Sequence, residues 1–158
     1  MDALFPGLKG MLNYHPLFVH FPIALWTAAL LFEIAARLAK KDELHRIACG
    51  VLALGALAAI PTVLSGWSAE AGVPPKGAAH DVKELHETLM VTASILSGIL
   101  AVLGLFVLPR KPTAALRAAF LVGLLVLVGL MAVGADRGAM LVYHYGTGVD
   151  WATAQQQK

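Results

Sequence analysis

Six histidines are the residues of this chain whose type and placement favour a chemical role. The imidazole side chain ligates haem iron, copper and zinc, and it exchanges protons near neutral pH. His20 and His86 each lie near the start of an apolar stretch, and an ionisable residue within a membrane span usually faces the interior of the helix bundle. We therefore predict that His20 and His86 are the two axial ligands of a b-type haem. His15 and His144 form an alternative pair of ligands, for a second haem or for a hydrogen bond to the first.

Two further residues are candidates for holding the haem propionates. Arg137 offers a planar cation that suits a carboxylate, and Tyr143 offers a hydroxyl group. The chain has no C-x-x-C-H motif, so a covalently attached haem is excluded. Gly134 and Gly138 form a G-x-x-x-G spacing, which lets a neighbouring backbone or a flat ligand approach closely.

Other functions stay open beside the haem prediction. His15, His20, His86 and His144 together are candidates for a copper or zinc site, although the sequence has no H-x-x-x-H or H-E-x-x-H pair. The many small residues also suit an accessory subunit that stabilises a larger respiratory or photosynthetic membrane complex without its own cofactor. No nucleophile and base are recognisable as a pair, and the single cysteine, Cys49, is interpreted as a packing residue. The sequence thus favours a non-enzymatic electron carrier, with a quinone or a cytochrome as redox partner, or an accessory subunit.

The composition places these residues in a membrane protein. The 158 residues are 58% hydrophobic and 14% charged, whereas a soluble domain carries about 25% charged residues. Four apolar stretches, approximately 17–38, 47–65, 88–108 and 118–133, are each long enough for a membrane-spanning helix, and 145 is an alternative end of the last. The sequence predicts a single all-α domain over 1–158, a multi-pass four-helix bundle with up-down topology. A net charge of +2 gives no indication of a nucleic-acid partner.

The distribution of cations predicts the orientation in the membrane. Cytoplasmic loops carry an excess of Lys and Arg. The first and third connectors hold most of the cations of the chain: Arg37, Lys40, Lys41, Arg46, Arg110, Lys111 and Arg117. These connectors should therefore lie in the cytoplasm, with both termini on the outer, periplasmic side of a bacterial inner membrane. All the histidines except His45 then lie near the outer face.

Pro22 predicts a local disturbance of the first helix, one turn from His20. A proline inside a helix removes the hydrogen bond to the carbonyl of the residue four positions earlier and pushes against that carbonyl. Here that residue is Phe18. We expect the helix to kink and to open space near the outer end of the bundle.

The motifs also resemble those of a known family. The opening run from His15 to Leu25 (HPLFVHFPIAL), His86 at the start of the third span, and the closing Leu141-Val142-Tyr143 with Gly146-x-Gly148-Val149 resemble the bacterial membrane-protein family called domain of unknown function 2231. The resemblance covers nearly the whole chain. It implies a four-helix membrane protein, often encoded near or fused to cytochrome-like modules, and it implies no established activity.

Overall fold

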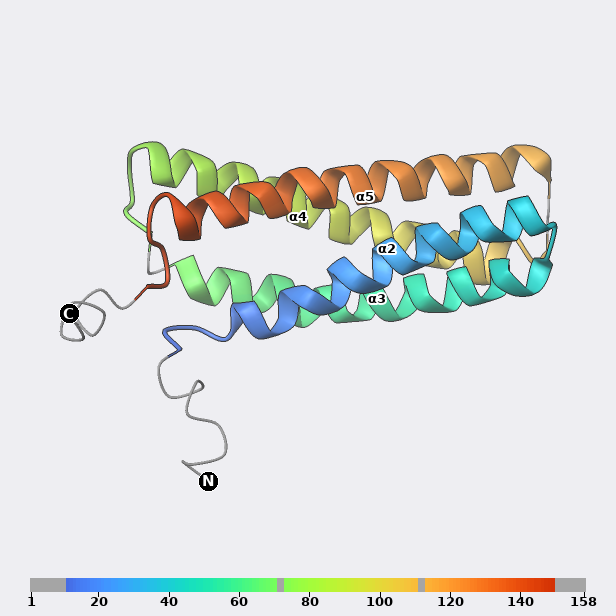
Figure 1. Ribbon diagram of the computed structural model, residues 1–158, viewed down its shortest axis with the longest axis horizontal. Helices are drawn as coiled ribbons and strands as arrows, with labels where there is room; N and C mark the ends of the chain where they lie inside the picture. Colours follow the sequence, from blue (N-terminus) through green and yellow to red (C-terminus); the bar gives the residue numbers. More distant parts are fainter. Residues whose placement is uncertain (1–10, 71–72, 111–112, 150–158) are drawn as a thin grey trace, which may run out of the picture.

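The computed structural model describes residues 11–70, 73–110 and 113–149 and consists of four long helices (Figure 1). These are α2 (His15–Ala39), α3 (Asp42–Ala69), α4 (Ala78–Val102) and α5 (Ala114–Tyr143). Helix α4 continues directly into a π-helical segment, η2 (Leu103–Val107). No strand occurs among the described residues, which confirms the all-α prediction.

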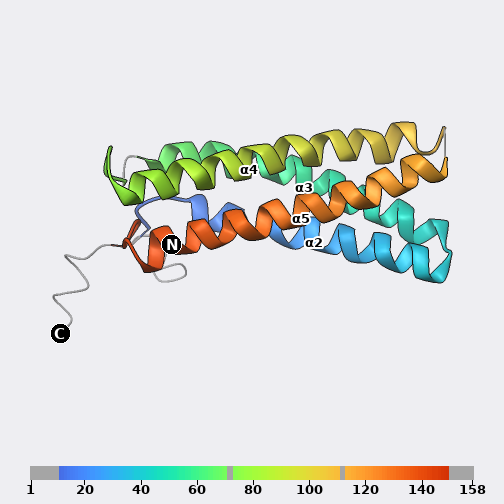
Figure 2. The ribbon, with the colours of Figure 1, turned by 90° about the horizontal axis from the view of Figure 1, so that it is seen from above.

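Each helix doubles back beside the one before it, and the four lie roughly parallel to one long axis (Figures 1 and 2). The start of α2 and the end of α5 lie at one end of the bundle, which we call the terminal end. The opposite end, where α2 turns into α3 and where η2 leads to α5, is called the hairpin end. Residues far apart in sequence therefore meet at each end.

The helices are longer than the predicted spans, most clearly at the starts of α3 and α4. Helix α3 begins at Asp42, because Lys40 adopts a left-handed backbone conformation (φ +53°) and turns the chain within two residues. Helix α4 begins at Ala78, ten residues before the predicted span, directly after Gly77 with φ +98°. Helix α5 reaches Tyr143, close to the longer of the two predicted limits.

Large apolar side chains occupy both the interior and the outer surface of the bundle. Trp26, Leu52, Phe120, Leu124 and Leu127 are completely buried and form the centre of the core. Equally apolar side chains point outward on every helix, among them Phe21, Leu57, Ile95 and Val122. A helix that is apolar on all sides is typical of a membrane span, and all four helices are long and apolar enough to cross a membrane.

Candidate functional site

A cavity of about 510 Å³ lies inside the terminal end of the bundle, and all four helices line it. We call it the histidine cavity, because both His15 of α2 and His86 of α4 line it. It extends along α2 from His15 to Trp26, a stretch that covers about 16 Å at the rise of an α-helix. Its deeper walls are mainly apolar and include Val19, Ile23 and Met90.

The imidazole of His15 is fixed by the backbone of α3. Its Nδ1 lies 3.1 Å from the main-chain oxygen of Thr62 and 3.1 Å from the hydroxyl of Ser65. The Ser65 hydroxyl itself donates to the Thr62 oxygen at 2.8 Å. A carbonyl oxygen only accepts hydrogen bonds, so the proton of a neutral His15 is on Nδ1. Gly66 provides the room, because a Cβ there would come within 3.2 Å of the ring.

His86 is held in the same manner by α5. Its Nδ1 donates to the main-chain oxygen of Gly134 at 2.7 Å. Gly138, one turn further, lies beneath the ring, and a Cβ at this position would come within 3.0 Å of it. The G-x-x-x-G spacing of α5 therefore receives α4: Gly134 accommodates Met90 and Gly138 accommodates His86.

These contacts give the two imidazoles the same chemical state. Each ring uses Nδ1 to donate to a main-chain oxygen, and neither Nε2 has a hydrogen-bond partner in the part of the chain that the structure describes. A neutral ring with its proton on Nδ1 carries a lone pair on Nε2. Ligating histidines are commonly oriented by such a hydrogen bond from the other ring nitrogen. The cavity therefore brings together two oriented imidazoles, from α2 and α4.

The other two histidine candidates lie elsewhere. His20 is exposed, its Nδ1 bonds to the Pro16 oxygen of its own helix at 2.8 Å, and it does not line the histidine cavity. His144 is also exposed, directly after α5, with its ring edge-on to Tyr145. The structure therefore brings His15 together with His86, and it does not bring His20 to His86 or His15 to His144.

The two propionate candidates take different positions. Tyr143 lines the cavity at its rim, but the residue is 89% exposed. Arg137 does not line the cavity, and its guanidinium group contacts Asp136 at 3.2 Å. Among the described residues that do line it, the one cation is Lys83, whose side chain is only 16% exposed.

Lys83 belongs to a set of polar contacts that joins α3 to α4 at the cavity. Its ammonium lies 3.2 Å from a carboxylate oxygen of Glu70 and 3.4 Å from one of Glu87. The indole of Trp67 donates to the other oxygen of Glu87 at 2.8 Å. All four side chains line the histidine cavity, so they form a polar border between the apolar interior and the terminal end.

Pro22 has the predicted effect on hydrogen bonding at the opposite wall. It is buried, it lines the cavity, and it leaves the carbonyl of Phe18 without its usual helical donor. The hydroxyl of Thr62 lies 3.2 Å from this carbonyl and 2.8 Å from the Ala58 oxygen of its own helix. The single hydroxyl proton of Thr62 is therefore shared between these two carbonyls, and the main-chain oxygen of Thr62 accepts from His15.

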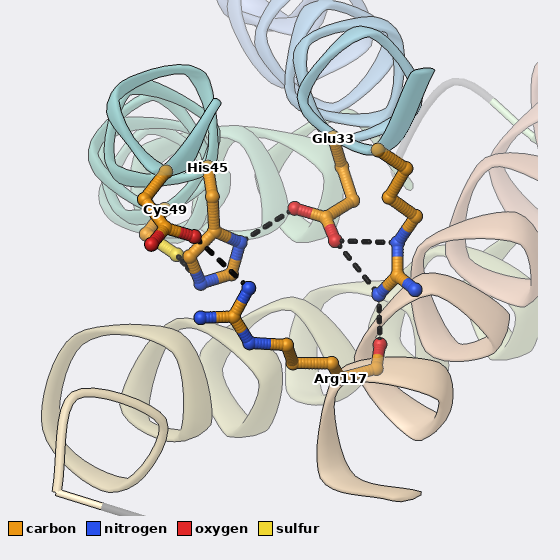
Figure 3. A network of polar contacts seen from close by, with 6 residues as sticks. Glu33, His45, Cys49 and Arg117 are labelled. Atoms are coloured by element: carbon orange, nitrogen blue, oxygen red, sulfur yellow. Dashed lines mark hydrogen bonds and ion pairs between the residues drawn. The ribbon is translucent and has the colours of Figure 1, made fainter. Parts of the chain in front are cut away.

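A second group of polar residues, absent from the sequence-based candidates, lies at the hairpin end (Figure 3). At its centre is Glu33 of α2, which is only 2% exposed. Arg37 donates to one oxygen of this carboxylate at 2.9 Å, and Nδ1 of His45 lies 2.6 Å from the other. A guanidinium nitrogen of Arg37 also donates to the main-chain oxygen of Arg117 of α5. Arg117 in turn pairs with Asp42 at 3.0 Å. We call these residues, with Cys49, the charged network.

Cys49 packs in the hydrophobic core, as interpreted from the sequence, and it also contacts His45 of the charged network. Its sulfur lies 3.6 Å from Nε2 of His45, one helical turn earlier in α3. Cys49 is buried against Gly104 of η2, where a Cβ would come within 2.8 Å of the sulfur. The sequence placed His45 in a loop and so hid its relation to Glu33 and Cys49. The available signal was Glu33 itself, because an acid within a membrane span requires a partner.

The described residues contain no group of three or more His, Cys, Asp or Glu side chains arranged to hold a metal ion. The histidine cavity supplies two imidazoles. In the charged network the Glu33 carboxylate and the His45 imidazole are hydrogen-bonded to each other.

Comparison with known proteins adds the family. No curated protein and no solved structure matches the chain. A family model described as predicted membrane protein (DUF2231) matches residues 11–151, which include all four helices and both polar sites. The resemblance seen in the sequence is thereby confirmed, and the protein belongs to the DUF2231 family of membrane proteins.

Proposed function

We propose that the protein binds a b-type haem in the histidine cavity, with His15 and His86 as axial ligands, and that it transfers electrons in the membrane. The observation that carries this proposal is the pair of imidazoles from α2 and α4 that line one cavity, each with Nδ1 donating to a main-chain oxygen. This arrangement leaves the lone pair of each Nε2 for a metal.

The surroundings of the two imidazoles suit an amphipathic, planar ligand. The cavity walls below them are mainly apolar, and Gly66 and Gly138 let the two rings pack closely against α3 and α5. Among the described residues Lys83 is the cation that lines the cavity, and a propionate would share it with Glu70 and Glu87, a role that the sequence had suggested for Arg137. Iron with two axial imidazoles is coordinatively saturated and supplies one-electron transfer.

The number of ligands favours haem over a zinc or copper ion. A catalytic zinc site uses three protein ligands and a structural one uses four, and the described residues bring no three suitable side chains together. A haem requires only two ligands from the protein, because the porphyrin supplies the others. The two imidazoles of the cavity meet this lower requirement.

The charge distribution supports an orientation with the histidine cavity on the outer side. The described cations Lys40, Lys41, Arg46 and Arg110 are exposed at the hairpin end, and positive residues favour the cytoplasmic side. Exposed aromatic residues, Tyr14, Phe21, Trp67 and Tyr143, surround the terminal end, as expected for a membrane interface. We therefore propose an up-down bundle in a bacterial inner membrane with periplasmic termini, in which a quinone or a cytochrome exchanges electrons with the haem.

The test is the reduced-minus-oxidised absorption spectrum of the protein purified from bacterial membranes in mild detergent, after growth with added haem precursor. We expect a b-type α band in the wild type and its loss in both His15→Ala and His86→Ala. His20→Ala and His144→Ala are the matched controls, because these imidazoles lie outside the cavity. Both controls should keep the band.

Two outcomes would overturn the proposal. A colourless wild-type protein after ample haem supply would exclude haem, and elemental analysis would then decide whether copper or zinc takes its place. A band that His20→Ala abolishes and His15→Ala preserves would show that the ligands are the pair expected from the sequence and not the pair in the cavity.

A further inference from the structure

We propose that Glu33, His45 and Cys49 form a buried proton-binding site at the hairpin end, which exchanges one proton with the aqueous phase on that side. The site is separate from the histidine cavity, so it stands whether or not haem binds there. It consists of a carboxylate from α2 and an imidazole and a thiol from α3 (Figure 3).

The first argument is the burial of an excess of ionisable groups. Taking charged side chains out of water costs several kcal/mol per ion unless each is well paired. Arg37 alone would balance the charge of Glu33, yet His45 lies 2.6 Å from the second carboxylate oxygen. Ionisable groups within a membrane span mark ion pathways and proton relays more often than they serve stability. The additional imidazole therefore indicates a group that gains and loses a proton.

The second argument is the geometry around His45. Its Nδ1 faces the Glu33 carboxylate, which only accepts, so the Nδ1 proton stays there in both charge states. The proton that comes and goes is therefore the one on Nε2. Nε2 faces the sulfur of Cys49 at 3.6 Å. In the neutral state Nε2 accepts a hydrogen bond from the Cys49 thiol, and in the cationic state Nε2 carries its own proton and donates toward the sulfur.

The other charged groups of the network leave this assignment unchanged. Arg37 of α2 and Arg117 of α5 remain protonated at all relevant pH values. Asp42 of α3 is exposed and paired with Arg117. On the remaining side, η2 presents Gly104 to the sulfur of Cys49, and α5 presents the ring of Phe120 to the imidazole of His45. Glu33 also contacts Arg37, which stays charged, so His45, whose Nε2 faces the Cys49 sulfur, is the group to which we assign the exchanged proton.

A route for the proton leads to the hairpin end. The His45 side chain is 14% exposed, whereas that of Glu33 is 2% exposed. The imidazole is therefore partly exposed near the hairpin end, while the carboxylate is enclosed by the helices. His45 lies only three residues after the start of α3, so water on that side of the membrane is the source and the acceptor of the proton.

The thiol of Cys49 provides the measurement, because the chain contains a single cysteine. We would record the infrared S–H stretching band of the purified wild-type protein over the pH range in which circular dichroism shows an intact fold. We expect the band to shift or to disappear in one titration step, as Nε2 changes from acceptor to donor. In His45→Asn this pH dependence should be lost, and in Glu33→Gln its midpoint should move.

His80→Asn is the matched control, because His80 and Glu84 form an exposed histidine–carboxylate pair at 3.2 Å in another helix. It should titrate as the wild type does, and Cys49→Ser should remove the band altogether. A wild-type band that stays constant over the whole pH range would overturn the proposal. A titration step that persists in His45→Asn would overturn it as well. The wild-type measurement needs no variant, so the proposal remains testable even if His45→Asn fails to fold.

Discussion

At the scale of single residues, the histidine cavity depends on which imidazoles turn inward. His15 and His20 are five positions apart, which places them about 140° apart around an α-helix. Only one of the two can therefore face the cavity, and contacts with Thr62 and Ser65 of α3 select His15. His20 instead bonds within its own helix. Thr62 is a second residue of this kind on α3, because its hydroxyl contacts the Phe18 carbonyl that Pro22 leaves without a helical donor.

The role of Thr62 leads to a prediction about stability. Thr62→Val keeps the shape of the side chain and removes the donor that lies 3.2 Å from the Phe18 carbonyl. We expect the free energy of unfolding in detergent to fall by about 1 kcal/mol, because that carbonyl has no helical donor. Thr27→Val is the control, since the Thr27 hydroxyl bonds only to Ile23 one turn earlier in the same helix. Equal losses for the two variants would refute the special role of Thr62.

At the scale of elements, the π-helical segment that follows α4 packs closely against α3 and α5. The π-helical segment η2 places Gly104 against the sulfur of Cys49 and the ring of Phe120. Such segments occur frequently at functional sites, and here η2 lies beside the charged network. The absence of a side chain at Gly104 therefore lets α4 approach α3 and α5 at the hairpin end.

Alanine substitutions at Gly104 of η2 and at Gly98 of α4 test that interpretation. In Gly104→Ala the new Cβ would lie 2.8 Å from the Cys49 sulfur and 3.0 Å from Phe120, whereas in Gly98→Ala it would meet no atom within 4 Å. Alanine is the better helix former in both cases. We expect Gly98→Ala to maintain or raise the thermal unfolding temperature. Gly104→Ala should lower it, corresponding to about 1–3 kcal/mol of overpacking; similar temperatures for both would contradict the close approach.

At the scale of the whole molecule, the two ends differ in their chemistry. The terminal end holds a mainly apolar cavity with two imidazoles, and the hairpin end holds a buried carboxylate paired with Arg37 and His45. A membrane protein with this division meets a different aqueous compartment at each end. The proposed electron transfer and the proposed proton exchange then take place on opposite sides of the bilayer.

Labelling with a maleimide that does not cross the membrane tests this orientation. In a Cys49→Ser background we would introduce Lys76→Cys before α4 and Lys41→Cys between α2 and α3, because both lysines are exposed. We expect intact cells to label Lys76→Cys alone and permeabilised cells to label both. Labelling of Lys41→Cys alone in intact cells would show that the protein has the opposite orientation.

The sequence was sufficient for the family and for the helical architecture, because long apolar stretches and the motif around His15 are local features. The pairing of His15 with His86 could not be predicted, since it depends on the rotation of α2 and α4 about their axes. The link between Glu33 and His45 was hidden for a different reason. The charged run around Asp42 was assigned to a loop, yet acidic residues in a first helical turn are favourable, and α3 begins there.

Both cavity imidazoles are oriented by main-chain oxygens, those of Thr62 and Gly134. Every amino acid at these two positions would present the same oxygen, so the orienting hydrogen bonds are insensitive to the identity of the side chain. A mutational scan that scores each position by its side chain would therefore miss both acceptors. Replacing the following amide by an ester, which weakens the carbonyl as an acceptor, would reveal them. The side chains at these positions serve packing, because Gly134 makes room for Met90 and the Thr62 hydroxyl contacts α2, while the hydrogen bonds that orient the imidazoles come from the backbone.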